Sequence, residues 1–409
     1  MSGSRVVLFI VTSFWAHGEL AIATEFARRM RGTGFTPLFL IPPTHRGAVA
    51  EAGFAHHVVI PGAGKINRIQ LADIQHVHRP ALVVLADFLN YDFCDRHYGL
   101  TRDDLDVFEC PIGTFDNFSW GREGAWLDTY GFKARYEGEI TLKGLSFRLR
   151  PCPLNHPTAP AEPGVFPYPL LAEPPATARP PAREIRAALG LDDGKPVVLV
   201  AGATWQRSHA AYPRVTAFVQ ACTEMLERLL TPLLEHAHVV SVGPSPVFRD
   251  GAPPGYHPLG PLAPARFAEL AGTVDLHVSN NVVSVSLHRL ALGGVPSAVV
   301  RNSLTADDGT LSESAREVFA RIGEPYPFHM FPVGWYHFLR SLLAGNPFAA
   351  LITPIEVFRE EAGLETLVGL LAPGPGRDRV EAARQDYLRT LNGLPDVETI
   401  LRRIAVPRG

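Results

Sequence analysis

Length, composition and charge exclude several classes of protein. The chain has 409 residues, which is too many for one ordinary core and indicates two α/β domains. Its net charge is -3, and no block of like charge suggests nucleic acid or an anionic membrane as a partner. Four cysteines that form no C-x-x-C pair indicate reduced thiols and a cytoplasmic protein.

The first part of the chain predicts a parallel sheet. The β-branched run at residues 6–11 is typical of a buried strand and is too short to span a membrane. Apolar side chains then recur at helical spacing through 19–31, and a second strand follows at 36–41. This order predicts a parallel sheet with right-handed crossovers. Further strands are expected at 55–60 and 81–86, with a strand or loop element at 111–118.

A proline-rich stretch at residues 151–181 predicts an extended linker, because it has few charges and no periodic pattern. The alternation of strand and helix then starts again. The sequence therefore predicts two doubly wound domains, at 1–150 and 182–409, the second ending in a helical tail from about residue 312. The second domain is expected to have helices at 182–189, 215–230, 264–271 and 284–292, and strands at 197–201, 238–242, 275–278 and 297–300.

His17 and Gly18 follow the first predicted strand, at the sheet edge where doubly wound folds bind ligands. A histidine there can act as a general base, or it can simply pack at the strand end. Ala16-His17-Gly18, with a helix that ends near Arg31, resembles the start of the family 1 GT-B glycosyltransferases. That resemblance implies two Rossmann-like domains facing across a cleft, with His17 deprotonating an acceptor hydroxyl. The family usually has a second His and a Pro after the pair, where this chain has Glu19 and Ile22.

Asp87 follows the strand predicted at 81–86 and resembles the carboxylate that orients the base in the same family. Such a carboxylate would fix the imidazole tautomer, although a solvated loop aspartate is the alternative. Aromatic and small polar residues at two strand ends could line an acceptor pocket or equally form packed loops. The acceptor-binding candidates are Trp15, Asp116, Asn117 and Trp120.

A polar loop at residues 279–286 follows a predicted strand and opens the helix that ends before Gly-Val-Pro. Free backbone N–H groups and the helix dipole favour an anion at such a helix start. The arrangement is similar to the segment that binds the donor diphosphate in GT-B enzymes. Asn281 falls where the family has its diphosphate-binding His, and Ser286 falls on the family's Ser. Asn280 and Ser284 complete this group of candidates.

Other donor-binding candidates follow further strands of the second domain. Thr204 and Arg207 could contact phosphate, although a surface turn is the alternative. Gly243 would lie near a nucleotide base, and Arg301 and Asn302 near a sugar. The aromatic segment at 326–335 has no counterpart in the family and suggests a divergent branch associated with natural-product clusters.

No metal and no cofactor are expected. The pairs at His76 and His78 and at His236 and His238 lack a carboxylate or Cys partner at ligand spacing, and the D-x-D at 104–106 is interpreted as a capped helix start. The chain also lacks the P-loop, the G-x-G-x-x-G after its first strand and the G-x-S-x-G of hydrolases.

The leading prediction is an inverting, metal-independent glycosyltransferase that moves a sugar from a nucleotide diphosphate sugar to a small-molecule acceptor in natural-product biosynthesis. Two alternatives stay open: another reaction on the GT-B fold, such as nucleotide-sugar epimerisation or non-glycosidic coupling, and a non-catalytic partner of another enzyme. The sequence leaves the oligomeric state open, and a homodimer is one alternative.

Overall fold

The computed structural model describes residues 4–15, 17–122, 126–135, 142–158, 161–171, 182–191, 194–248, 251–305, 308–322 and 325–405. The chain forms two compact units, and neither is one continuous stretch. Unit 1 contains Met1–Gly124, Glu137–Ala172 and Arg389–Gly409. Unit 2 contains Ala125–Tyr136 and Glu173–Leu388.

Within its described residues, unit 1 is built on a seven-stranded sheet of order β3-β2-β1-β4-β5-β8-β9, in which every pair is parallel. The central strands are apolar at nearly every position because helices cover both faces. Its strands are β1 (Arg5–Ile10), β2 (Phe35–Ile41), β3 (Ala55–Val58), β4 (Leu82–Leu85), β5 (Ile112–Phe115), β8 (Phe147–Cys152) and β9 (Val165–Pro169). Its helices are α1 (Gly18–Arg28), η1 (Pro43–His45), α2 (Arg46–Glu51), α3 (Gly64–His78), α4 (Phe88–Asp92), α5 (Asp95–Tyr98), η2 (Asp103–Val107) and α16 (Val397–Ala405).

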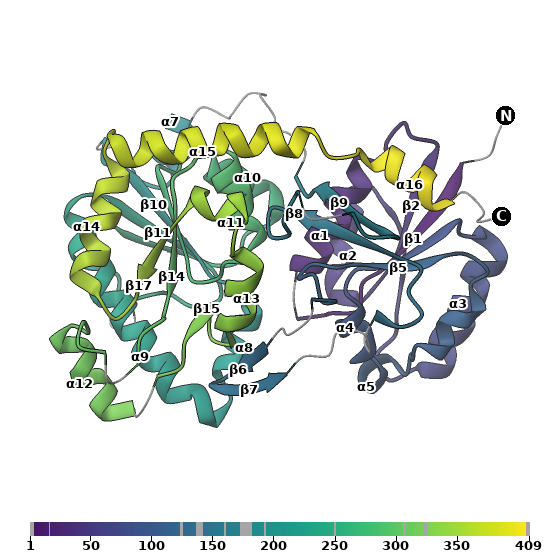
Figure 1. The fold of residues 1–409 in the computed structure, drawn as a ribbon, viewed down its shortest axis with the longest axis horizontal. Helices are drawn as coiled ribbons and strands as arrows, with labels where there is room; N and C mark the ends of the chain where they lie inside the picture. Colours follow the sequence, from purple (N-terminus) through teal and green to yellow (C-terminus); the bar gives the residue numbers. More distant parts are fainter. Residues whose placement is uncertain are drawn as a thin grey trace. The chain divides into compact units, whose positions relative to one another are not determined.

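Unit 2 repeats this plan with a six-stranded parallel sheet in its described part, of order β12-β11-β10-β13-β14-β17. The strands are β10 (Val197–Ala201), β11 (His238–Val242), β12 (Tyr256–Leu259), β13 (Leu276–Ser279), β14 (Ser297–Arg301) and β17 (Ile352–Glu356). The helices are α7 (Ala182–Ala188), α8 (Thr204–Ala210), α9 (Pro213–Leu230), η3 (Pro232–Glu235), α10 (Pro264–Ala271), α11 (Val285–Leu292), α12 (Glu313–Ile322), α13 (Tyr336–Leu343), η4 (Pro347–Leu351), α14 (Glu360–Leu371) and α15 (Pro375–Asn392), whose last residues reach unit 1. The helices α9 and α14 cover one face of the sheet and α10 and α11 the other (Figure 1). Two doubly wound, Rossmann-like units confirm the predicted fold class.

A hairpin from the N-terminal half of the chain belongs to unit 2. The strands β6 (Trp126–Thr129) and β7 (Phe132–Arg135) join β15 (Phe328–Met330) and β16 (Gly334–Trp335) in a small antiparallel sheet. Asp128 fixes the hairpin to α13, because its carboxylate accepts hydrogen bonds from the backbone N–H groups of Tyr336 at 3.0 Å and His337 at 3.1 Å. Local periodicity predicts neither this exchange nor the return of α16 to unit 1.

The prediction of a linker at residues 151–181 was wrong over its described residues up to 171. β8 runs to Cys152, and β9 forms an edge strand of the unit 1 sheet. Proline is tolerated in β9 because an edge strand leaves one row of its backbone groups without a ladder partner. Buried Tyr168 anchors β9 by packing edge-on against Phe26 of α1. The remaining part of the predicted linker, 172–181, lies outside the described residues.

Candidate functional site

The strands β2, β1, β4 and β5 are neighbours and parallel, so the loops after them meet at one edge of the unit 1 sheet. The loop after β1 carries His17, and η1 after β2 ends at His45. Asp87 follows β4, and Asp116 follows β5. Unit 1 therefore gathers the predicted base, the predicted orienting carboxylate and two further titratable residues along one edge, as the sequence indicated for the first two.

His17 is exposed and stands at the N-terminus of α1, where its carbonyl accepts the first helical hydrogen bond, from the Ala21 N–H at 2.9 Å. Its ring lies 4.8 Å from the ring of His45, centroid to centroid. Neighbouring groups remove part of the water around the imidazole and so lower the pKa of His17 below its ordinary value. The ring is therefore mainly neutral at pH 7 and can accept a proton. Ala16, the first residue of the recognised triplet, lies outside the described residues.

The side chain of Asp87 caps the start of α4 instead of hydrogen-bonding to His17. Its Oδ1 accepts a hydrogen bond from the Asn90 N–H at 2.9 Å, and the residue is only 7% exposed. Burial raises the pKa of Asp87 to about 6, against the opposing effect of the N–H groups at the start of α4. In the described part of the chain, no hydrogen bond joins this carboxylate to the imidazole of His17. The orienting role predicted for Asp87 stays a prediction.

Glu19 is a candidate that the sequence analysis missed. Its Oε1 accepts a hydrogen bond from the Asn90 side chain at 3.0 Å, and its Oε2 accepts one from the Ser13 hydroxyl at 3.3 Å. Burial, and then the nearby charge of Asp87, raise the pKa of Glu19 to about 7. An acidic residue directly after the His-Gly pair was the available signal, but in the sequence it appeared only as a departure from the family's second His.

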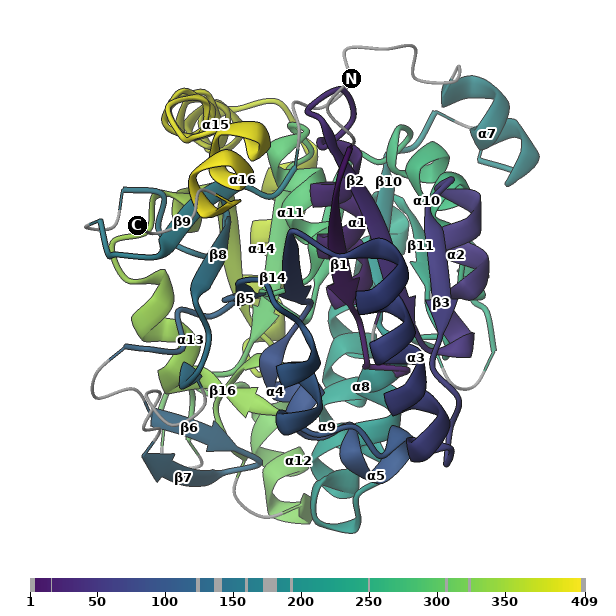
Figure 2. The same cartoon turned by 90° about the vertical axis from the view of Figure 1, so that its right-hand side faces the viewer.

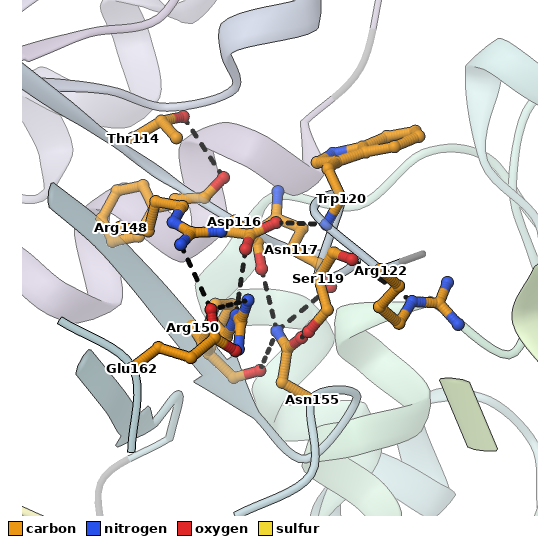
Figure 3. A network of polar contacts seen from close by, with 12 residues as sticks. Thr114, Asp116, Asn117, Ser119, Trp120, Arg122, Arg148, Arg150, Asn155 and Glu162 are labelled. Atoms are coloured by element: carbon orange, nitrogen blue, oxygen red, sulfur yellow. Dashed lines mark hydrogen bonds and ion pairs between the residues drawn. The ribbon is translucent and has the colours of Figure 1, made fainter. Parts of the chain in front are cut away.

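Two of the acceptor-binding candidates after β5, Asp116 and Trp120, belong to an internal network (Figure 3). Asp116 is fully buried, and its carboxylate accepts from Arg150 Nε at 3.0 Å and from the Trp120 N–H at 2.8 Å. Arg150 bridges onward to Glu162 at 2.7 Å. Trp120 is 1% exposed and packs edge-on against Phe88. Asp116 and Trp120 thus hold the loop together, and their positions give no support to the predicted acceptor contacts.

The other two acceptor candidates differ from these. Asn117 is 7% exposed, and its side-chain Oδ1 has no hydrogen-bond partner within the described structure. Trp15 is half-buried and packs edge-on against Phe14, with the two ring centroids 4.7 Å apart, and the ring of His97 lies nearby. The acceptor-binding roles of Trp15 and Asn117 stay predictions.

The carboxyl edge of the unit 2 sheet brings together loops after β10, β11, β13 and β14. Thr204 and Arg207 are exposed at the start of α8, and Arg207 donates to the Pro244 carbonyl at 3.0 Å. Gly243 must be glycine because a Cβ there would lie 2.8 Å from the Gly202 carbonyl oxygen. The backbones of the loops after β10 and β11 therefore pack directly against each other at Gly202 and Gly243.

Ser284 caps α11, since its hydroxyl accepts a hydrogen bond from the Leu287 N–H at 3.4 Å. The hydroxyls of Ser284 and Ser286 lie 2.7 Å apart, and both residues are half-buried. Asn280 accepts at 2.8 Å from the side chain of Gln206, a contact that the sequence gave no reason to expect. This helix start combines hydroxyl groups with the positive end of a helix dipole. The anion site predicted here stays a prediction.

Two other donor candidates belong to the scaffold. The side-chain Oδ1 of buried Asn281 accepts a hydrogen bond from the Val283 N–H at 3.0 Å. Asn302 is fully buried, and its amide donates to the Tyr326 carbonyl at 3.1 Å. Their backbones bridge to the two ends of β15, so the segment at 326–335 runs along the ends of β13 and β14. Arg301 forms an ion pair with Glu356, with 2.7 Å between Nε and Oε1.

The described residues contain no group of three or more His, Cys, Asp or Glu side chains that could hold a metal ion. None of their helices has the length and apolar character needed to cross a bilayer. A cavity of about 360 Å³ lies elsewhere in unit 1, between the end of α1, the end of β9 and the chain before α16, so it shares no residue with the candidate site.

Comparisons with known proteins agree on the fold. The spinosyn forosaminyltransferase SpnP matches with a TM-score of 0.56 and 15% identity, over 98% of each chain. The glycosyltransferase SnogD from Streptomyces nogalater matches with a TM-score of 0.52 and 16% identity, over 98% of this chain and 99% of that one. The spinosyn rhamnosyltransferase SpnG, solved with thymidine diphosphate, matches with a TM-score of 0.52 and 13% identity, over 98% and 99%. The predicted resemblance to GT-B glycosyltransferases is thereby confirmed at the level of fold.

Sequence comparison gives a narrower result. No curated protein matches the chain significantly. Residues 26–409 match the family described as "Family of unknown function (DUF6365)". That match covers both sheets and both candidate edges, apart from β1 and the His17 loop. The chain therefore belongs to this family of unknown function.

Proposed function

We propose that this protein is a glycosyltransferase that transfers a sugar from a nucleotide diphosphate sugar to a small-molecule acceptor, with inversion and without a metal ion. The observation that carries the proposal is the position of His17, a mainly neutral imidazole at the carboxyl end of β1. Structures of the same fold include glycosyltransferases for natural products, among them SpnG with thymidine diphosphate. We extend the proposal to a cytoplasmic enzyme of natural-product biosynthesis.

In the proposed reaction, unit 1 supplies the groups for the acceptor and unit 2 those for the donor. His17 takes the proton from the acceptor hydroxyl or amine as that group attacks the anomeric carbon, and the bond from this carbon to the diphosphate oxygen breaks. The leaving diphosphate gains negative charge. The N–H groups at the start of α11, with the hydroxyls of Ser284 and Ser286, stabilise that charge. Thr204 and Arg207, both exposed at the same sheet edge, are further phosphate contacts in this proposal.

His17→Ala tests the proposed base. We expect a loss of turnover of about 100-fold or more, because general base catalysis contributes on this scale, while nucleotide affinity stays within about twofold. Single-turnover assays and calorimetric titration with a nucleoside diphosphate measure the two quantities. His236→Ala, at an exposed site in unit 2, is the control. Wild-type turnover by His17→Ala would refute the base assignment.

Ser286→Ala tests the proposed diphosphate contact. Loss of one hydroxyl donor is expected to weaken nucleoside diphosphate binding by about three- to tenfold. Thr366→Ala, which removes a half-buried hydroxyl from α14, far along the chain from Ser286, is the control. Unchanged affinity in Ser286→Ala contradicts the proposed site, whereas an equal loss in both variants points to a general effect on the fold.

One observation favours a second candidate reaction on the same fold. The side chains of Asn281 and Asn302, two residues expected to hold the donor, bond within the scaffold instead. Burial also raises the pKa of Glu19 to about 7 and the pKa of Asp87 to about 6. Carboxyl groups of this kind can move protons on a nucleotide sugar without forming a glycoside. Product analysis separates the two reactions, since a new glycoside supports transfer and an isomerised sugar nucleotide supports epimerisation.

A further inference from the structure

His45 occupies an unusual position beside the proposed base. It ends η1, directly after β2, and its side chain is fully buried. Its Nε2 lies 2.7 Å from the backbone carbonyl oxygen of Ser13. A carbonyl can only accept, so Nε2 carries the hydrogen, and in the neutral ring Nδ1 keeps the lone pair. The tautomer of His45 is therefore set by the backbone.

The loop that carries His17 is attached to His45 at two points. Ser13, near the start of the loop, accepts the hydrogen bond from His45, and the imidazole of His17, at its end, packs at 4.8 Å with the ring planes inclined at 55°. The hydroxyl of Ser13 donates to Glu19, which Asn90 also binds. The loop is thus held from η1, α1 and α4 together.

Asp87, the residue that the fold resemblance suggested for orienting the base, is engaged elsewhere, with the N–H groups of α4. His45, by contrast, has a ring contact with His17, and its own orientation is fixed by the hydrogen bond to Ser13. We propose that His45 is a positioning residue, which holds the His17 imidazole in the orientation needed to accept the acceptor's proton. This inference rests on the proposed function and names a partner for its base.

A fixed orientation matters because a base must present its lone pair along the direction of proton transfer. A carboxylate partner also stabilises the imidazolium that forms. The ring of His45 supplies orientation through shape and carries no negative charge. The arrangement therefore predicts a base that is well placed but gains little from a charged partner.

The test is NMR of full-length protein labelled with 15N and 13C at histidine, with the His17 signal identified by its loss in His17→Ala. We expect a changed tautomer ratio at His17 in two variants. His45→Phe keeps a ring but loses the bond to Ser13. His45→Gln can keep that bond through its amide N but has no ring. The midpoint of the His17 titration should also move, by about 0.3 pH units or more. In turnover assays, kcat should fall about 10- to 100-fold with KM within about threefold.

His97→Phe is the matched control, because His97 contacts Phe14 and Trp15 at the same sheet edge. Its His17 signal should equal that of the wild type. The inference is overturned if folded His45→Gln leaves the His17 tautomer and titration unchanged, or if His97→Phe shifts them equally. Changed His17 signals in a protein that forms no glycoside support the pairing and refute the proposed reaction, so the two failures are distinguishable.

Discussion

The carboxyl group of Glu19 ties α1 to α4 and to the loop after β1. Its ionisation has a consequence for stability. The pKa of Glu19 is raised to about 7 in the folded protein, whereas an unfolded chain loses this proton near pH 4.5. Between these values the folded state holds more protons than the unfolded state, so stability from this group is present below pH 4.5 and is lost as pH rises through 7.

Glu19→Gln should therefore flatten the pH dependence. We expect the variant to be more stable than the wild type at pH 8, by roughly 1–3 kcal/mol, and to approach it at pH 4.5. Urea unfolding at both pH values measures the difference. A variant that is less stable than the wild type at pH 8 contradicts the assignment, since the amide can still bond to Ser13 and Asn90.

His277 of β13 presents the opposite case. It is fully buried, and neither ring nitrogen has a hydrogen-bond partner within the described structure. Burial lowers the pKa of His277 to about 3, so its neutral form contributes stability above the unfolded pKa of about 6.5 that is lost as pH falls toward 3. His277→Leu should reduce this loss and raise the unfolding free energy at pH 5, measured by denaturant titration. Equal slopes against pH in both proteins would count against this reading.

At the scale of elements, the hairpin of β6 and β7 stabilises α13 through one carboxylate. Asp128 is 4% exposed and accepts from the first N–H groups of the helix. Asp128→Ala should lower the unfolding free energy by about 2 kcal/mol, as expected for removal of a buried helix cap. Thermal unfolding measures this effect, with Asp103→Ala at an exposed position as the control. Asp128→Asn should lose less, because its amide oxygen still accepts.

The loop after β5 depends on a buried ion pair. Arg150→Met removes the cation beside the fully buried carboxylate of Asp116 and should cost about 3–5 kcal/mol of stability. Arg148→Met, which removes a more exposed contact to Glu162, is the control and should cost under about 1 kcal/mol. If Arg150→Met unfolds like the wild type but loses acceptor binding, Asp116 belongs to the binding surface after all.

Most of the helices and strands could be predicted from the sequence, whereas their grouping into the two units could not. Buried parallel strands such as β10 and β11 are short β-branched runs, so their bounds were predicted to within a residue. β9 was missed because its prolines are typical of a linker, and only its edge position makes them acceptable in a sheet. The position of His17 at the end of β1 could be predicted because its loop directly follows a strand, whereas its role stays a prediction. Contacts made through tertiary packing, such as those of Glu19, His45 and Gln206, leave no local pattern.

At the scale of the whole molecule, each unit is assembled from separate stretches of chain. The C-terminal α16 belongs to unit 1, where Val397, Ile400 and Leu401 are buried, and it lies beside the end of β9 (Figures 1 and 2). Deletion of residues 389–409 should thus loosen the unit at the opposite end of the sequence. Hydrogen exchange is expected to rise in α1 and β9 and to stay unchanged in β10 and β11. A rise confined to unit 2 would contradict this assignment.

The exchanged hairpin and the returning α16 also constrain how the molecule can be made. During synthesis, Asp128 leaves the ribosome 208 residues before Tyr336, the first residue of the helix that it caps. Unit 1 receives α16 only after the last residue of unit 2, Leu388, has been made. Unit 1 therefore cannot be completed before all residues of unit 2 have been made, so we do not expect the domain-by-domain folding from the N-terminus that many two-domain chains show.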